Sequence, residues 1–257
     1  MANMRAFQAC DESSILSART NKTSHLMCGF LLAYDTIKKM IKAVVIDIDD
    51  TLCLTETASF EIENTALELM GLPPMSRQIH IDTWGQPMPK VINVRSPGID
   101  ADRFMPIYLP TIQEFVASGR LDAIPAENYE TLDKLIEMDK DIMILTSRTY
   151  VELKHLLEPD HLLTNRLKAF YHKDNIEFCK PDPRAFDKLL SDHDLEPTDC
   201  VYIGDSISDA KSATTAGLHF IASLESGLRT KSDFKDFQVD AFVDKFTDII
   251  TAISKIK

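Results

Sequence analysis

Short apolar runs alternate with helical patterns along this sequence, and this alternation restricts the folds that the chain can adopt. The run AVVI, which begins at Ala43, is rich in β-branched residues and is typical of a strand buried on both faces of a parallel sheet. Further strands are expected at 141–146, 200–204 and 218–222, with a weaker candidate at 167–171. Helical patterns at 126–139, 150–157, 183–191 and 206–216 separate them. The alternation predicts a doubly wound, Rossmann-like α/β core whose strand carboxyl ends share one edge.

One region, from about residue 56 to 121, breaks this alternation. Helical patterns at 56–70 and 110–118 flank a stretch rich in proline and turn residues, and no buried strand is apparent between them. We therefore expect an inserted helical domain at 56–121. The α/β core would comprise 40–55 and 122–257, and residues 1–39 would form an extension of unknown role.

Charge and cysteine usage narrow the function classes. The chain has 40 acidic and 28 basic residues, for a formal charge of −12, which opposes binding to nucleic acid or anionic membranes. Its longest apolar stretch near the N-terminus, residues 25–34, is far shorter than the roughly 20 residues of a membrane span. The five cysteines are scattered without close pairs, as expected for reduced thiols in the cytoplasm. A protein this acidic needs a local positive group to bind an anion.

Two carboxylates follow the first predicted strand directly. Asp47 could attack phosphorus, and Asp49 could protonate the leaving oxygen and later deprotonate water. A solvated acidic turn would give the same short pattern, so these two residues alone do not establish a catalytic site.

A hydroxyl pair and a lysine follow later elements. Thr146 and Ser147 end the second predicted strand, where a hydroxyl and a backbone N–H can bind phosphoryl oxygens. Lys180 stands in the rigid sequence KPDP before a predicted helix, which would hold its ammonium as a fixed charge. Each residue alone has an ordinary structural explanation, namely a strand end or a surface lysine.

The sequence GDSISD after the strand at 200–204 supplies two more acids. Asp205 offers the carboxylate that a Mg²⁺ site needs, since this ion prefers carboxylates together with water and substrate oxygens. Asp209, one helical turn later, could orient Lys180 or a metal-bound water. The alternative is an aspartate that only caps the helix.

Together the segments VVIDIDDTL, MILTSR, KPDP and YIGDSISDA resemble the four motifs of the haloacid dehalogenase-like superfamily, over about residues 41–225. The resemblance implies a Mg²⁺-dependent phosphatase that hydrolyses a small phosphomonoester through an aspartyl-phosphate. It implies a flavodoxin-like strand order and a helical cap after the first motif, as in phosphoglycolate phosphatase-like members and β-phosphoglucomutases. The resemblance also implies roles for single residues. Asp47 would be the nucleophile and a metal ligand, and Asp49 would be the acid/base and a metal ligand through its carbonyl. Thr146 and Lys180 would bind phosphate, and Asp205 would be a metal ligand.

Three other functions fit the same fold. A sugar phosphomutase would share the core, but Ser59 and Phe60 occupy the neighbourhood where β-phosphoglucomutases have a histidine. A dehalogenase would lack the second aspartate that Asp49 supplies, and a non-catalytic phosphate-binding module is expected to have lost a motif residue. Asp50 stands where many relatives have glycine, but other phosphatases of the superfamily also have aspartate there.

Substrate choice is expected to depend on the cap. Its polar or aromatic candidates are Arg77, His80, Trp84, Lys90, Arg95 and Arg103. The turn formed by residues 84–87 is the preferred specificity element. The expected partner is a small phosphorylated metabolite, and neither its identity nor the oligomeric state follows from the sequence.

Overall fold

The computed structural model describes residues 40–84, 86 and 88–256. The predicted extension at 1–39 lies outside the described residues, as do Gly85 and Pro87 of the turn at 84–87. Residues Ile41–Ile256 belong to a single compact unit, so the domain boundaries expected from the sequence stay a prediction.

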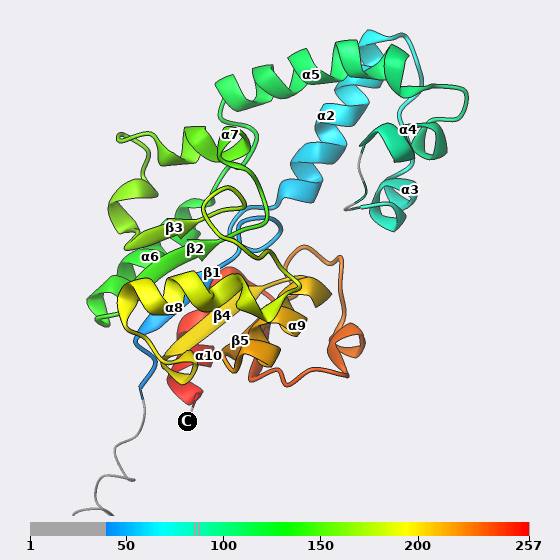
Figure 1. Ribbon diagram of the computed structural model, residues 1–257. Helices are drawn as coiled ribbons and strands as arrows, with labels where there is room; N and C mark the ends of the chain where they lie inside the picture. Colours follow the sequence, from blue (N-terminus) through cyan, green and yellow to red (C-terminus); the bar gives the residue numbers. More distant parts are fainter. Residues whose placement is uncertain (1–39, 85, 87, 257) are drawn as a thin grey trace, which may run out of the picture. The chain divides into compact units, whose positions relative to one another are not determined.

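One six-stranded parallel sheet forms the centre of the described fold (Figure 1). Its strand order is β3-β2-β1-β4-β5-β6. The strands are β1 (Ala43–Ile46), β2 (Asp141–Leu145), β3 (Ala169–Tyr171), β4 (Cys200–Gly204), β5 (His219–Ser223) and β6 (Ala241–Val243). The expected doubly wound α/β fold is confirmed, while β6 was not predicted.

The strand order corrects one expectation. A flavodoxin-like sheet has the order 2-1-3-4-5, which the present sheet would show if β3 were removed and the strands renumbered. The short strand β3 pairs with β2 through Met143 and Ala169 and extends that edge. It thereby gives the other common doubly wound order, 3-2-1-4-5-6.

Alternate residues of each strand enter two separate cores. On one face, Val44 and Ile46 pack with residues of α6 (Ala126–Glu137) and α10 (Ile249–Lys255). On the other, Ala43 and Val45 pack with residues of α8 (Asp187–His193) and α9 (Ile207–Ala216). Burial on both faces explains why β1 is apolar throughout.

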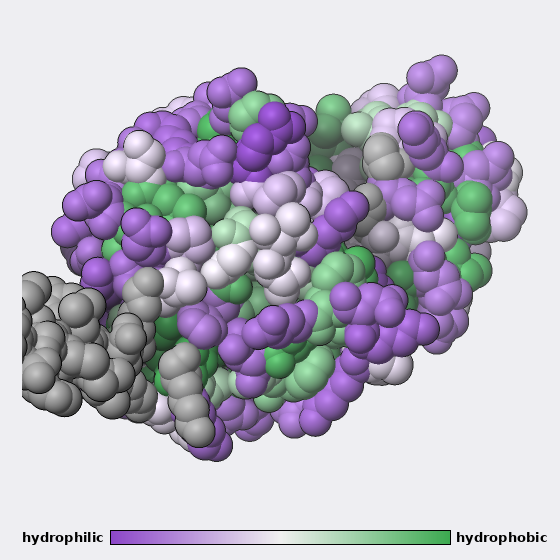
Figure 2. Space-filling model, turned by 60° about the horizontal axis from the view of Figure 1, so that its bottom comes forward, coloured by the Kyte–Doolittle hydropathy of each residue, from purple (hydrophilic) through white to green (hydrophobic). Residues whose placement is uncertain are grey.

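Short helices complete the core. They are α7 (Tyr150–Leu153) and the 3₁₀ helices η1 (Lys154–Leu157), η2 (Thr164–Arg166), η3 (Pro183–Phe186), η4 (Pro197–Asp199), η5 (Lys231–Phe234) and η6 (Phe246–Asp248). None of the helices described is long and apolar enough to cross a membrane. Polar residues cover most of the face shown in Figure 2, and apolar residues appear between them in separate groups.

The inserted cap is helical, with α2 (Thr55–Leu69), α3 (Arg77–Asp82), α4 (Met88–Arg95) and α5 (Ala101–Ala117) between β1 and α6. Figure 1 shows α2 and α5 side by side. The cap has its own apolar core, which includes Leu67, Ile92 and Phe104.

Helix α5 was predicted only from residue 110, because proline disfavours a helix interior. The helix in fact runs through Pro106 and Pro110. Asp100 caps its N-terminus, with a carboxylate that accepts the Arg103 N–H at 2.9 Å. The buried side chains of Phe104 and Phe115 supply packing that outweighs the local preference.

The strand order reverses between β1 and β4, which are neighbours paired through Ile46 and Ile203. Such a switch point leaves a crevice at the carboxyl ends of the strands, where α/β proteins bind ligands. Asp47 directly follows β1 and Asp205 directly follows β4, so the fold brings these two acids to that point.

Candidate active site

Asp47 is held by the sheet although it lies beyond β1. Its backbone N–H donates to the Ile203 carbonyl at 2.9 Å. The chain then turns tightly, with the N–H groups of Leu52 and Cys53 donating to the Ile48 carbonyl at 3.0 and 3.1 Å. Asp47 therefore projects from a fixed backbone at the start of a compact loop, which we call the catalytic loop (residues 47–53).

Lys180 lies between two carboxylates. Its Nζ is 2.9 Å from Asp47 Oδ1 and 2.7 Å from Asp209 Oδ1, and it also donates to the Tyr202 hydroxyl at 2.8 Å. The lysine side chain is only 4% exposed. Although burial would lower the pKa of Lys180, the charges of Asp209 and Asp47 raise it above its ordinary value. The lysine is thus a fixed positive charge beside Asp47.

Asp209 is positioned by Ser206, the residue that caps its own helix. Ser206 caps α9 in a reciprocal capping box: Asp209 Oδ2 accepts the Ser206 N–H at 3.0 Å and the Ser206 hydroxyl at 2.6 Å, and the Asp209 N–H donates to the Ser206 hydroxyl at 3.1 Å. Gly204 permits this close approach, since a Cβ at that position would lie 2.6 Å from Asp209 Cγ. Both oxygens of Asp209 already have partners, which suits a residue that orients Lys180.

Tyr202 is a site residue that the sequence did not single out, although it lies inside the fourth motif. Its buried hydroxyl lies 3.1 Å from both the Leu145 carbonyl and Asp209 Oδ1, one of which accepts its proton. Burial and the neighbouring charges of Asp209 and Asp47 raise the pKa of Tyr202 well above its ordinary value. The hydroxyl therefore stays protonated and can accept from Lys180.

Three carboxylates suit a divalent cation. Ligand oxygens of Asp47, Asp205 and Asp209 all lie within 4.8 Å of one another. Burial, followed by the charges of Asp209 and Asp47, raises the pKa of Asp205 well above its ordinary value. Among the residues described, no cationic side chain forms an ion pair with Asp205. Asp205, and Asp47 which also contacts Lys180, are the acids that could hold Mg²⁺, together with the Asp49 carbonyl that the sequence resemblance implied.

The same crowding acts on Asp47. Burial raises the pKa of its carboxyl to about 8, against the charge of Lys180, which lowers it. The negative charges of Asp209 and Asp49 add to the rise. A bound cation would offset the effects of burial and of the neighbouring negative charges, and would favour the ionised form that a nucleophile needs.

Asp49 lies beside an arginine that had no predicted role. Arg148 Nη1 is 3.4 Å from Asp49 Oδ1, while the guanidinium makes two hydrogen bonds of 2.8 Å to the carboxylate of Asp122. Packing against protein atoms raises the pKa of Asp49, although the Arg148 charge opposes this. A carboxyl with a raised pKa is suited to donate a proton.

Asp122 anchors this arginine from the segment between α5 and α6. It is 4% exposed, and its Oδ2 is 3.0 Å from His155 Nε2. Burial alone would raise the pKa of Asp122, but hydrogen bonds from His155 and Arg148 hold it below its ordinary value. Asp122 stays ionised and fixes Arg148.

Thr146 and Ser147 lie where they were predicted, immediately after β2, the neighbour of β1. Thr146 is buried, its N–H donates to the Tyr171 carbonyl at 3.0 Å, and its Oγ1 accepts the Arg148 N–H at 3.3 Å. Ser147 is exposed. Their phosphate-binding roles stay a prediction.

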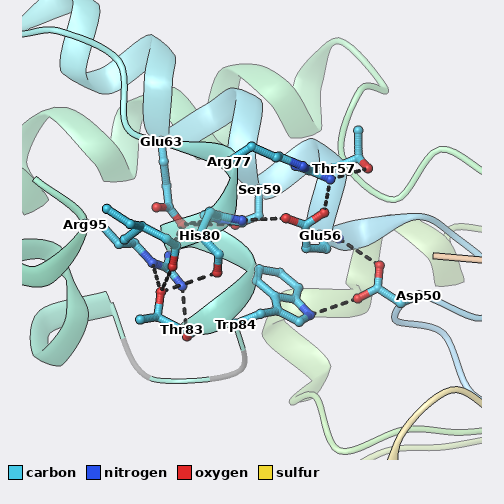
Figure 3. Close-up of polar contacts among 11 residues, drawn as sticks. Asp50, Glu56, Thr57, Ser59, Glu63, Arg77, His80, Thr83, Trp84 and Arg95 are labelled. Atoms are coloured by element: carbon cyan, nitrogen blue, oxygen red, sulfur yellow. Dashed lines mark hydrogen bonds and ion pairs between the residues drawn. The ribbon is translucent and has the colours of Figure 1, made fainter. Parts of the chain in front are cut away.

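The cap candidates divide into two groups (Figure 3). Trp84 donates its indole N–H to Asp50 Oδ2 at 2.9 Å, and Arg77 pairs with Glu56 at a partly exposed position. His80 is fully enclosed: its Nδ1 lies 2.6 Å from Glu56 Oε1 and its Nε2 3.1 Å from Glu63 Oε1. We therefore expect His80 to maintain the cap interior rather than to contact substrate.

The remaining candidates also separate by burial. Arg95 is 3% exposed and pairs with Glu63, so it belongs to the cap interior. Lys90 and Arg103 are exposed. Burial of these residues could not be predicted from the sequence, because the residue type alone does not show whether an arginine at a helix end faces the interior or the solvent.

Comparison with known proteins agrees with the predicted motifs. The family model described as haloacid dehalogenase-like hydrolase matches residues 44–223. The phosphoglycolate phosphatase of Aliivibrio fischeri is 23% identical over 222 residues, which span 83% of this chain and 97% of the relative. That of Nitrosospira multiformis is 26% identical over 226 residues, which span 84% and 96%. The predicted enzyme class, a phosphoric monoester hydrolase of this family, is that of these relatives.

Solved structures agree on the fold. A Thermotoga maritima protein assigned as a β-phosphoglucomutase superposes with a TM-score of 0.68 at 19% identity, over 84% of this chain and 100% of that one. CbbY from Rhodobacter sphaeroides, solved in complex with phosphate, gives 0.60 at 17% identity, over 84% and 100%. At such identities these structures support the architecture alone.

Proposed function

Because this chain belongs to the haloacid dehalogenase-like hydrolase family, we propose that it is a Mg²⁺-dependent phosphatase acting on a small phosphomonoester through a phosphorylated Asp47. One observation supports this most strongly. At the switch point of the sheet, the Asp47 carboxylate lies 2.9 Å from a buried lysine and within 4.8 Å of two further carboxylates. Because the carboxylates outnumber the lysine among them, a divalent metal would be attracted to this site. The bound metal would in turn permit an anionic substrate to bind.

In the first step, an Asp47 oxygen forms a bond to phosphorus while the bond from phosphorus to the ester oxygen breaks. Asp49 gives its proton to the departing oxygen, so that an alcohol leaves. The pKa of Asp49, raised by burial, favours the protonated form that this step requires.

In the second step, water attacks the phosphorus of the aspartyl-phosphate. Asp49, now ionised, takes a proton from the water, and the Asp47 carboxylate is regenerated as inorganic phosphate departs. Both residues return to their starting forms, so no other reactant is needed.

Lys180 supplies charge throughout both steps. Phosphoryl transfer depends mainly on positioning and on stabilising charge on the phosphoryl oxygens. Lys180 is oriented by Asp209 and Tyr202, and Thr146 and Ser147 would donate hydrogen bonds to the phosphoryl group from the end of β2. Mg²⁺, when held by Asp47, Asp205 and the Asp49 carbonyl, would neutralise charge on the attacking and phosphoryl oxygens.

The substrate is proposed to be a small phosphorylated metabolite, with 2-phosphoglycolate as the first candidate because curated relatives act as phosphoglycolate phosphatases. Trp84 and Arg77 are the cap residues proposed to influence selection. We expect a hydrolase rather than a mutase, because Ser59 and Phe60 stand where β-phosphoglucomutases have a histidine, and both are engaged within the cap: Ser59 donates to Glu63 at 3.3 Å, and Phe60 packs against His80 with ring centroids 5.3 Å apart.

The test is phosphate release from a panel of phosphomonoesters that includes 2-phosphoglycolate, sugar phosphates and nucleotides. We expect turnover with Mg²⁺ and none after chelation. Asp236→Asn is the control variant, because Asp236 is exposed and distant in sequence from the four motifs. A folded wild-type protein that releases no phosphate from the panel with Mg²⁺ would refute the proposal.

A further inference from the structure

Asp50, on the catalytic loop, has a side chain that the proposed reaction does not use. Its backbone φ is +55°, in the left-handed region that glycine adopts most easily and aspartate tolerates. The residue is only 2% exposed. A glycine would satisfy this backbone conformation, so the buried carboxylate requires a separate explanation.

Both oxygens of Asp50 bind groups of the cap (Figure 3). Oδ1 accepts the backbone N–H of Glu56, in the first turn of α2, at 2.9 Å. Oδ2 accepts the indole N–H of Trp84, which follows α3, also at 2.9 Å. One side chain thus joins the catalytic loop to two places in the cap that are 28 residues apart in sequence.

These contacts close a ring of four residues. The Glu56 carboxylate binds His80 Nδ1 at 2.6 Å, and the His80 and Trp84 rings lie 5.3 Å apart between centroids. The ring therefore runs from Asp50 to Glu56, His80, Trp84 and back to Asp50. Each member restrains the next, so the indole cannot shift without breaking a hydrogen bond or a ring contact.

A second set of contacts holds this ring from the cap side. Glu63 lies 3.1 Å from His80 Nε2 and also pairs with Arg95. Arg95 donates to Thr83 Oγ1 at 2.8 Å and to the Thr83 carbonyl at 3.0 Å, next to Trp84 in the chain. The indole thus lies beside a connected set of cap contacts, and its hydrogen bond to Asp50 joins that set to the catalytic loop.

We propose that Asp50 is a positioning residue that holds Trp84 and the start of α2 against the catalytic loop. It thereby fixes the position of the cap relative to Asp47 and Asp49. A purely structural role accounts poorly for this residue. A buried carboxylate whose hydrogen-bond partners, among the residues that the structure describes, are two neutral N–H groups loses much of its hydration energy, whereas glycine would fit the backbone without that cost. The effect on catalysis rests on the proposed phosphatase function, but the contact between Asp50 and Trp84 does not.

Two variants separate the parts of this proposal. Asp50→Gly keeps the left-handed backbone and removes both acceptors. Asp50→Asn keeps the shape and one acceptor oxygen, so it should rescue part of the effect. The control is Asp100→Gly, which also replaces an aspartate that accepts a backbone N–H, that of Arg103 at 2.9 Å, but lies at the start of α5 and contacts no indole.

Trp84 is the only tryptophan of the chain, so intrinsic fluorescence reports its surroundings directly. In Asp50→Gly we expect emission at longer wavelength and stronger quenching by acrylamide, with a smaller change in Asp50→Asn and none in Asp100→Gly. Unchanged emission and quenching in a folded Asp50→Gly protein would overturn the proposal.

Kinetics test the catalytic part. On the best panel substrate, we expect kcat to fall by about tenfold or more in Asp50→Gly, because small misplacements of reacting groups are costly, while Asp100→Gly retains wild-type kcat. Trp84→Phe should reduce kcat similarly, and combining it with Asp50→Gly should add little, since both variants remove the hydrogen bond between Asp50 and Trp84. Wild-type kcat and KM in folded Asp50→Gly, or fully additive effects, would contradict positioning. If wild type itself is inert, the proposed function fails, and fluorescence still decides the contact.

Discussion

Two buried clusters of charged side chains in this protein differ in how far their acidic groups are matched by basic ones. In the cap cluster, Glu56 pairs with Arg77 and His80, and Glu63 pairs with Arg95 and His80. Every acid there has a basic partner within the protein.

The active-site cluster is built differently. Asp47, Asp205 and Asp209 lie close enough to share one metal ion, and within the described part of the chain Lys180 is the cationic side chain that pairs with members of this group, namely Asp47 and Asp209. Burying like charges is costly, and a fold selected for stability alone would avoid it. The excess negative charge supports the proposal that a cation binds at this site, whereas the balanced cluster supports the cap.

The largest effect is expected for Asp47→Asn. Turnover should fall by at least about 10³-fold, because the proposed nucleophile is removed. Thermal unfolding in the absence of metal should occur at the same or a higher temperature, because one of three crowded negative charges is lost. Phosphate release and calorimetry measure the two quantities, and a variant that retains turnover would contradict the role of Asp47.

The cap cluster should respond in the opposite way. Arg95→Met removes the arginine partner of Glu63, leaving it with His80 and Ser59, and should lower the free energy of unfolding by about 3–5 kcal/mol, as for other buried pairs that lose one partner. The control is Lys188→Met, which breaks the exposed pair with Asp192 and should cost at most about 1 kcal/mol. Denaturant unfolding of the two proteins gives the comparison. Equal losses would show that the cap cluster is not a supporting element.

The pH dependence of stability should distinguish the active-site cluster as well. The pKa of Asp47 is raised from an ordinary 3.8 to about 8 in the metal-free folded protein, so the folded state binds more protons between these values. Its contribution to stability is present below about pH 4 and is lost as the pH rises through about 8.

This dependence is measured as the difference in melting temperature between wild type and Asp47→Asn across the same pH range, without metal. Wild type should lose stability relative to the variant as the pH rises, and Mg²⁺ should reduce the loss. A difference that is constant with pH would mean that Asp47 is not crowded by its neighbours.

The smallest effect concerns Arg148, whose charge opposes the rise in the pKa of Asp49. Arg148→Gln should lower kcat/KM by about tenfold and move the pH profile of kcat/KM to higher pH, since acid/base catalysis follows the pKa of the group. Arg148→Lys keeps the charge but not the two hydrogen bonds to Asp122, so its profile should move less. An unshifted profile in the glutamine variant would remove Arg148 from the account.

The sequence predicted the core well because its signals are local. Burial on both faces made β1 and β4 apolar, and the strand order then brought Asp47 and Asp205 together. The strand β6 and the helices α3 and α4 were missed because they are short and lack a clear periodic pattern.

The contacts that position the site could not be predicted, because they join distant parts of the chain. Arg148 and Asp122 are 26 residues apart, and Trp84 and Asp50 are 34 apart. Asp50 did carry a signal, since an aspartate in place of glycine suggests a left-handed backbone, but its partners depend on how the cap folds. His80 likewise looked like a substrate ligand until its burial between two glutamates was known.

The most direct test of the central claim is to trap the covalent intermediate. Wild type is mixed with Mg²⁺ and the best panel substrate, quenched in acid within the first turnover, and digested for peptide mass spectrometry. The account predicts one added phosphoryl group on Asp47 and none in the Asp47→Asn protein. Turnover without phosphorylation of Asp47, or a phosphoryl group on another residue, would contradict it.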